Sequence, residues 1–174
     1  MANLSADARR LADELKRRDV KVVFAESCTG GLVAASLATV PGISDHLCGS
    51  AVTYRNDTKL QWLGVSSQKL SSRGPVSSTV AREMATGVLA MTPEADWSAS
   101  VTGHLGPNAP RRLDGVVYVG IAHRENHESA ATALRVTASR HVLAAESRTP
   151  RQHEAASLVL RQLLAAINAW REEQ

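Results

Sequence analysis

Three consecutive residues whose side chains can act as nucleophiles or hydrogen-bond donors, Ser27, Cys28 and Thr29, follow a short apolar run at 22–25. That run is rich in β-branched residues, which is typical of a buried strand. The residues from Leu32 onward have the apolar spacing of one helical face. A strand that leads through a small-residue turn into a helix aims side chains and backbone N–H groups outward at the helix N-terminus. Such a turn is suited to holding an anion or presenting a nucleophile.

Within this turn, Gly30 and Gly31 allow a ligand to approach the backbone closely. On its pattern alone, Ser27 is as readily a helix cap as a nucleophile. Cys28 is a rival nucleophile, since a helix N-terminus lowers a thiol pKa. We rank it below Ser27, because no histidine nearby indicates a Cys–His pair.

Composition excludes several classes of function. The net charge is only +3, from 20 basic and 17 acidic residues, and 3% of residues are aromatic, so no basic groove with interleaved aromatics is expected and nucleic-acid binding is not predicted. No apolar run approaches the ~20 residues that a membrane span needs. No signal peptide is visible, and a cytoplasmic location is expected. The six histidines lack metal-ligand spacing, so we predict no metal and no cofactor.

Periodicity and breaker residues predict alternating strands and helices. The expected helices span residues 4–19 (with Ser5 as N-cap), 31–39, about 56–64, about 77–91 and 151–171, and the expected strands span 21–25, 47–54, 97–102, 115–122 and 128–137, with a polar connection at 66–75 and a loop at 103–114. The last two strands are joined by a short link, which favours an antiparallel pair. We therefore expect one α/β domain over residues 1–174. It should have three layers (α/β/α), a mixed, mostly parallel sheet of about five strands, and functional loops at one end of the sheet.

Several motifs in order resemble one known family. They are A-E-S-C-T-G-G at 25–31, V-P-G-I-S at 40–44, V-T-Y-R-N-D-T-K at 52–59, G-P-V-S at 74–77, T-G-H-L-G-P at 102–107 and G-V-V-Y at 115–118. Together they are similar to the C-terminal domain of the competence/damage-inducible protein CinA, a family that includes nicotinamide mononucleotide deamidases. The resemblance extends from about residue 20 to about residue 165.

The chain departs from the family pattern in segments that we expect to contact ligand. The stretch 108–114 is stiffer and more basic than the usual glycine-rich loop, with Arg111 and Arg112 in it. Ser50 stands where glycine is usual. Only Arg148 remains of a G-D-R motif, because Glu146 and Ser147 precede it.

The resemblance implies an amidohydrolase that converts nicotinamide mononucleotide to nicotinate mononucleotide and ammonia in pyridine nucleotide recycling. Ser27 would be the nucleophile and Lys59 its base, because burial beside a serine lowers a lysine pKa. Tyr54 would orient this Ser–Lys pair or relay a proton for it. The expected substrate-binding residues are Cys28, Thr29, Gly30, Gly31, Asn56, Thr102, Gly103, Gly106 and Arg148, with backbone N–H groups at 29–31 serving an oxyanion or a phosphate. His104, in the altered loop, is a further candidate contact.

Two other interpretations stay open at this point. The altered loop and the incomplete G-D-R motif fit a non-catalytic module that binds a nucleotide or a partner. The other open interpretation is an amidase that acts on another small amide. The chain is similar to a short stand-alone form of the family. We expect its binding partner to be a small-molecule nucleotide. A homo-oligomer paired through a helix or sheet face is left open.

Overall fold

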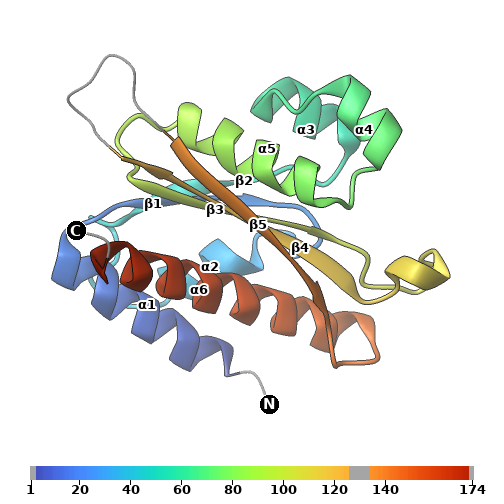
Figure 1. Ribbon diagram of the computed structural model, residues 1–174. Helices are drawn as coiled ribbons and strands as arrows, with labels where there is room; N and C mark the ends of the chain where they lie inside the picture. Colours follow the sequence, from blue (N-terminus) through green and yellow to red (C-terminus); the bar gives the residue numbers. More distant parts are fainter. Residues whose placement is uncertain (1–2, 126–133, 173–174) are drawn as a thin grey trace.

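The computed structural model describes residues 3–125 and 134–172, with side chains to residue 170. One mixed sheet of five strands lies between two layers of helices (Figure 1). The strands are β1 (Val22–Glu26), β2 (Leu47–Val52), β3 (Trp97–Gly103), β4 (Val116–Arg124) and β5 (Leu134–Val142). The helices are α1 (Leu4–Arg18), α2 (Leu32–Ala38), α3 (Asn56–Leu63), α4 (Ser67–Arg73), α5 (Ser78–Ala90) and α6 (Arg148–Glu172), and η1 (Arg111–Leu113) is a short 3-10 turn.

The strand order is β2-β1-β3-β4-β5. β1 pairs in parallel with β2 and β3, whereas β3–β4 and β4–β5 are antiparallel. The sheet is mixed and mostly parallel, as predicted, because β1, β2, β3 and β5 run in one direction and β4 runs in the opposite one. β4 is reversed because residues 104–115 form a loop without the crossover helix that a parallel return requires.

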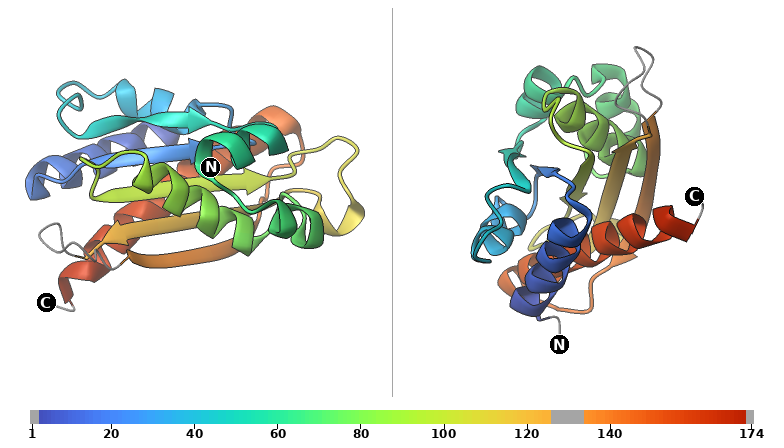
Figure 2. Two further views of the ribbon diagram at one scale, coloured as in Figure 1. Left: turned by 90° about the horizontal axis from the view of Figure 1, so that it is seen from above. Right: turned by 90° about the vertical axis from the view of Figure 1, so that its left-hand side faces the viewer.

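Every residue of β1 is buried, because helices cover both faces of the sheet. Alternate side chains of a strand point to opposite faces. Val22 and Phe24 therefore pack with α1, α2 and α6, while Val23 and Ala25 pack with α3, α4 and α5. The two views in Figure 2 show these layers from above and from the side.

One helix was missed in the sequence. α4 lies where a polar connection was predicted, at 66–75. The sequence pattern does not indicate this helix, because only Leu70 of it is buried and its residues form no apolar stripe. Its boundary residues were the available signal: Ser66 caps the N-terminus with its side chain and Gly74 follows the C-terminus.

The other differences concern boundaries. Asn3 rather than Ser5 caps α1, since its side chain accepts the Ala6 N–H at 3.1 Å. α6 begins three residues before the predicted start, at Arg148. The predicted last strand at 128–137 falls partly on residues 126–133, which lie outside the described residues, and β5 is found at Leu134–Val142. Its predicted antiparallel pairing with β4 is confirmed.

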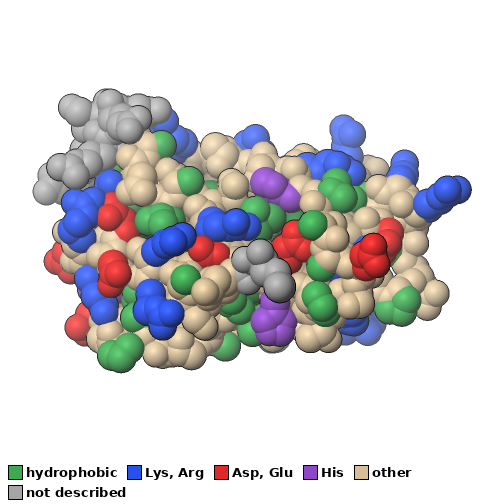
Figure 3. Space-filling view, turned by 90° about the horizontal axis from the view of Figure 1, so that it is seen from below, with side chains coloured by type: hydrophobic (Ala, Val, Ile, Leu, Met, Phe, Trp, Pro, Cys, Tyr) green, Lys and Arg blue, Asp and Glu red, His purple; other side chains and the backbone are tan. Residues whose placement is uncertain are grey.

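The face formed by α1 and α6 carries basic and acidic side chains side by side (Figure 3). In α1, for example, Glu14 pairs with both Arg17 and Arg18 at 2.5 Å. No helix within the described ranges combines the length and the apolar character that crossing a membrane requires.

Candidate active site

The site forms at one edge of the sheet, where strands of the same direction end. β1, β2 and β3 are parallel, so their carboxyl ends meet at that edge. Ser27 follows β1, Tyr54 follows β2, and Gly103 ends β3. β5 runs in the same direction as β3 after two antiparallel steps, and it delivers Arg148 at the start of α6 to this edge.

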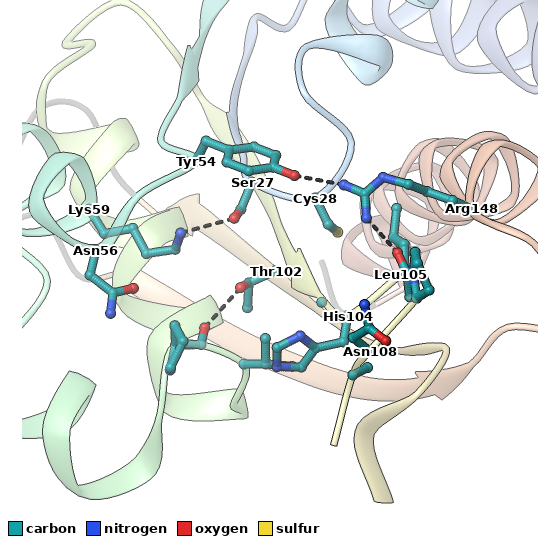
Figure 4. A pocket seen from close by; sticks show the side chains of 16 residues that line it. Ser27, Cys28, Tyr54, Asn56, Lys59, Thr102, His104, Leu105, Asn108 and Arg148 are labelled. Carbon is teal, nitrogen blue, oxygen red and sulfur yellow. Dashed lines mark hydrogen bonds between the residues drawn. The ribbon is translucent and has the colours of Figure 1, made fainter. Parts of the chain in front are cut away.

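Ser27 and Lys59 are in direct contact. The Lys59 Nζ donates to Ser27 Oγ at 2.9 Å and to the Thr53 carbonyl oxygen at 2.7 Å (Figure 4). Ser27 is fixed in turn by its N–H, which donates to the Val101 carbonyl at 3.0 Å. α3 delivers Lys59 because the chain turns directly from β2 into this helix and presents residue 59 inward with Leu63. The two residues predicted to form the Ser–Lys pair thus lie side by side.

The environment of Lys59 favours its neutral form. Its side chain is 1% exposed, and no carboxylate within the described residues pairs with it. Burial lowers the pKa of Lys59 from 10.5 to about 8, with a small opposing effect from Cys28. A lysine with this pKa is partly unprotonated near neutral pH and can accept a proton.

The Cys28 thiol has the opposite tendency. Burial raises the pKa of Cys28 to about 12, and the attraction of Lys59 offsets this only in part. A thiol in this state is a poor nucleophile, because the thiolate is the reactive form. Ser27 therefore remains the better candidate in this turn.

A buried carboxylate that the sequence analysis overlooked, Glu26, organises the start of α2. It is 1% exposed and accepts the N–H groups of Gly31, Val33 and Ala34, each at 3.0 Å. The Thr29 hydroxyl also donates to it, at 2.7 Å. The carboxylate lies where the positive end of the helix would attract an anion.

This arrangement corrects part of the predicted site. Thr29, Gly30 and Gly31 do not line the cavity beside Ser27. The Gly31 N–H is bound by Glu26, and the Gly30 N–H donates to the Ser27 carbonyl at 3.1 Å. These two N–H groups are therefore not available to an oxyanion or a phosphate. Within residues 3–125 and 134–172, the N–H groups of Cys28 and Thr29 donate to no other residue.

Ser50 also has a different place from the one expected. Its hydroxyl donates to Glu26 at 3.0 Å, and it does not line the cavity. The replacement of glycine by serine at this position thus adds a hydrogen bond to the buried carboxylate rather than a ligand contact.

Tyr54 and Arg148 meet across the mouth of the cavity. The Arg148 guanidinium donates to the Tyr54 hydroxyl and to the Gly106 carbonyl, both at 2.7 Å. Figure 4 shows the tyrosine hydroxyl directed toward Arg148. It has no hydrogen bond to Ser27 or Lys59, so the predicted relay between Tyr54 and this pair is not formed in the structure. Tyr54 is instead held at the mouth of the cavity.

The cavity at Ser27 has a volume of about 250 Å³. Of the predicted site residues it is lined by Ser27, Cys28, Tyr54, Asn56, Lys59, Thr102, Gly103, Gly106 and Arg148, and His104 also lines it. The Thr102 hydroxyl is engaged with the Pro75 carbonyl at 2.8 Å. Asn108 and Ala109, from the stretch that was expected to contact ligand, line it as well, whereas sequence reasoning missed Pro75, Val76, Leu105 and Pro107. Proline and glycine marked both segments as turns, but a turn signal does not show which side of the loop faces a cavity.

The altered loop is anchored by an ion pair. Arg151 donates to both Asp114 carboxylate oxygens, at 2.7 and 3.0 Å, and this contact lowers the pKa of Asp114. Neither Arg111 nor Arg112 lines the cavity at Ser27, whereas Arg111 lines a neighbouring one. Within the described residues, no group of three His, Cys, Asp or Glu side chains is arranged to hold a metal ion.

The chain has an α/β fold with a mixed sheet, and a buried Ser–Lys pair lies where its parallel strands end. Comparison with known proteins then identifies the family. The family model described as "CinA C-terminal domain" matches residues 5–163, so the chain belongs to the CinA C-terminal domain family.

Relatives and solved structures agree with this assignment. A "CinA-like protein" of Prochlorococcus marinus (strain MIT 9312) is 42% identical over 119 residues, which cover 67% of this chain and 28% of that protein. A "putative competence-damage inducible protein" of Halothermothrix orenii is 41% identical over 122 residues, or 67% of this chain and 29% of that protein. The chain thus matches less than a third of the length of these relatives. The crystal structure of the competence/damage inducible protein CihA from Agrobacterium tumefaciens is 30% identical, with a TM-score of 0.84 and 95% of each chain covered.

Proposed function

We propose that this chain is an amidohydrolase that deamidates nicotinamide mononucleotide to nicotinate mononucleotide and ammonia by a Ser–Lys mechanism. The observation that carries the proposal is the 2.9 Å contact between Lys59 Nζ and Ser27 Oγ at the wall of a cavity. A protonated hydroxyl is a poor nucleophile and needs a neighbouring base. A buried lysine whose pKa lies near 8 supplies that base.

In the first step, the neutral Lys59 amine takes the proton of the Ser27 hydroxyl as Ser27 Oγ attacks the carboxamide carbon. The carbonyl oxygen becomes an oxyanion. The Cys28 N–H is a candidate donor for it, because it belongs to the residue after the nucleophile and donates to no other residue within the described ranges.

In the second step, the C–N bond breaks and the Lys59 ammonium returns its proton to the leaving nitrogen, which departs as ammonia. Ser27 is left as an acyl ester. Water then attacks this ester with Lys59 again acting as base, and the nicotinate product and the free Ser27 hydroxyl are released. Each proton taken is returned, so Lys59 ends each cycle unprotonated.

The remaining cavity residues are proposed to bind the nucleotide. Tyr54, Asn56, Thr102 and Gly103 line the same space as Ser27. Arg148 offers its guanidinium to the phosphate, and its present partners, Tyr54 and Gly106, are uncharged groups that an anion can replace. The mechanism requires no cofactor and no metal.

The test is ammonia release from nicotinamide mononucleotide by the purified chain. We expect turnover by the wild type and a loss of about 1,000-fold or more in Ser27→Ala and in Lys59→Met, because each removes one half of a unit that acts together. Undiminished release in both variants would contradict the mechanism. Tight nucleotide binding without hydrolysis by the wild type would identify a non-catalytic binding module, and release from other amides only would identify a different amidase.

A further inference from the structure

An anionic substrate group needs positive charge, and two obvious sources beside Ser27 are already used. The N-terminus of α2 holds the Glu26 carboxylate, which accepts three backbone N–H groups there. A phosphate placed at this point would meet a buried negative charge. Lys59 is 1% exposed and directs its amine to Ser27 and to the Thr53 carbonyl. The anion must therefore bind elsewhere around the cavity.

A second cavity adjoins the first along the loop after β3. The two share Leu105, Gly106, Pro107, Asn108 and Ala109, together with Arg148, as a common wall. The second has a volume of about 690 Å³ and is otherwise lined by charged and polar residues, namely Arg111, Asp114, Glu146, Ser147 and Arg151. A ligand that reacts at Ser27 can extend past Arg148 toward it.

The charges around the second cavity are not all compensated. Arg151 and Asp114 neutralise each other through two hydrogen bonds of 2.7 and 3.0 Å. Within the described residues, the hydrogen bonds of Arg148 go to two uncharged oxygens, those of the Tyr54 hydroxyl and the Gly106 carbonyl. Arg111 is exposed and forms no hydrogen bond or ion pair within residues 3–125 and 134–172. Glu146 is the opposing carboxylate, and its charge acts on the neighbouring Arg151.

We propose that the second cavity is an anion subsite of the same active site, in which Arg111 binds an anionic group of the substrate and Arg148 orients it at the shared wall. This inference rests on the proposed function and deepens it, because it assigns a specificity residue in the loop that departs from the family pattern. The substrate class is a small amide that carries a phosphate or similar anion set apart from the amide group. A guanidinium suits this role because it offers two parallel donors to such an anion.

The chain supplies a matched control for Arg111. Arg112 is the next residue of η1, has the same charge and is also exposed, but it lines neither cavity. Replacing Arg112 by glutamine changes the net charge of the loop by the same amount as replacing Arg111. Glu146→Gln supplies a test of opposite sign, because it removes the carboxylate that faces the proposed anion.

The experiment measures binding by calorimetry in Ser27→Ala protein, which prevents turnover. The probes are nicotinamide mononucleotide and nicotinamide riboside, which carry the same amide with and without the phosphate. We expect Arg111→Gln to weaken nucleotide binding by about 10-fold and to leave riboside binding unchanged. Glu146→Gln should strengthen nucleotide binding by about two- to fivefold, and Arg112→Gln should change it by less than about twofold.

The inference is overturned if Arg111→Gln leaves nucleotide affinity within twofold of the parent protein, weakens both ligands equally, or acts no more strongly than Arg112→Gln. Failure to bind either ligand overturns it as well. The proposed function is judged separately by ammonia release from the wild type. Selective binding with no turnover would contradict the hydrolase alone, and turnover indifferent to Arg111 would contradict the subsite alone.

Discussion

At the scale of single residues, the site depends on two opposite effects of burial, which lowers the pKa of Lys59 and raises the pKa of Cys28. Lys59 loses its preference for the charged form, which makes it a base, and Cys28 keeps its proton, which makes it inert. Both effects have the same physical origin, because a low-dielectric environment disfavours whichever form carries charge. Ser27 is thereby selected over Cys28, and within the described residues its hydrogen-bond partner is Lys59 rather than a histidine.

This difference predicts that Cys28 is dispensable for the chemical step. Cys28→Ala should retain ammonia release within about threefold of wild type, since only a small buried side chain is lost. The native thiol should react slowly with iodoacetamide at pH 8, where it remains protonated. A loss in Cys28→Ala comparable to that of Ser27→Ala, or rapid alkylation that abolishes activity, would transfer the nucleophilic role to Cys28.

At the scale of elements, the position of Lys59 depends on how closely α3 approaches α5. A Cβ placed on Gly87 of α5 would lie 2.0 Å from the carbonyl oxygen of Leu63, the last residue of α3. No side chain fits into this contact, so glycine at 87 allows the helix that carries Lys59 to rest against α5.

Gly87→Ala should therefore push α3 outward. We expect a loss of about 1–3 kcal/mol in unfolding free energy, the usual cost of overpacking, together with lower activity as Lys59 moves away from Ser27. Denaturant melts and the ammonia assay measure both effects. Thr86→Ala, at the neighbouring position, is the control, and a Gly87→Ala protein that matched it in both measurements would show that the contact is not restrictive.

The elements also show what the sequence could predict. Strong signals, such as the apolar run of β1 and the stripe of α6, located the layers, and the order of strands and helices indicated which loops meet at one edge. Contacts that depend on three-dimensional placement were not accessible. The sequence does not show whether Glu26 binds a ligand or, as in the structure, accepts the N–H groups at the start of α2. It also does not show that the Tyr54 hydroxyl contacts Arg148 rather than Lys59.

At the scale of the whole molecule, a buried lysine makes folding stability depend on pH. The pKa of Lys59 is about 8 in the folded chain and 10.5 as the reference for the unfolded chain. Between these values the unfolded state binds more protons, so stability rises with pH. Below about pH 8 both states are protonated, and the folded state bears the full cost of the buried charge.

We therefore predict that this residue alone raises the unfolding free energy by about 2 kcal/mol between pH 7 and pH 9.5. Lys59→Met, which keeps the packing volume without the charge, should lack this increment and should be more stable than wild type at pH 7. Urea melts of both proteins at the two pH values isolate the effect, because all other titrating groups are shared. Parallel pH dependence in the two proteins would show that the Lys59 pKa is not lowered by burial.

The claim on which the account depends is that the neutral amine of Lys59 activates the Ser27 hydroxyl. Its most direct test is the pH dependence of kcat/KM for ammonia release from nicotinamide mononucleotide, measured from pH 6 to pH 10. We predict a rate that rises with pH and levels off through a single group with a pKa of about 8, and a Lys59→Arg protein with no comparable activity at any pH, because a guanidinium keeps its proton. A flat profile across this range, or an active Lys59→Arg protein with the same inflection, would contradict the claim.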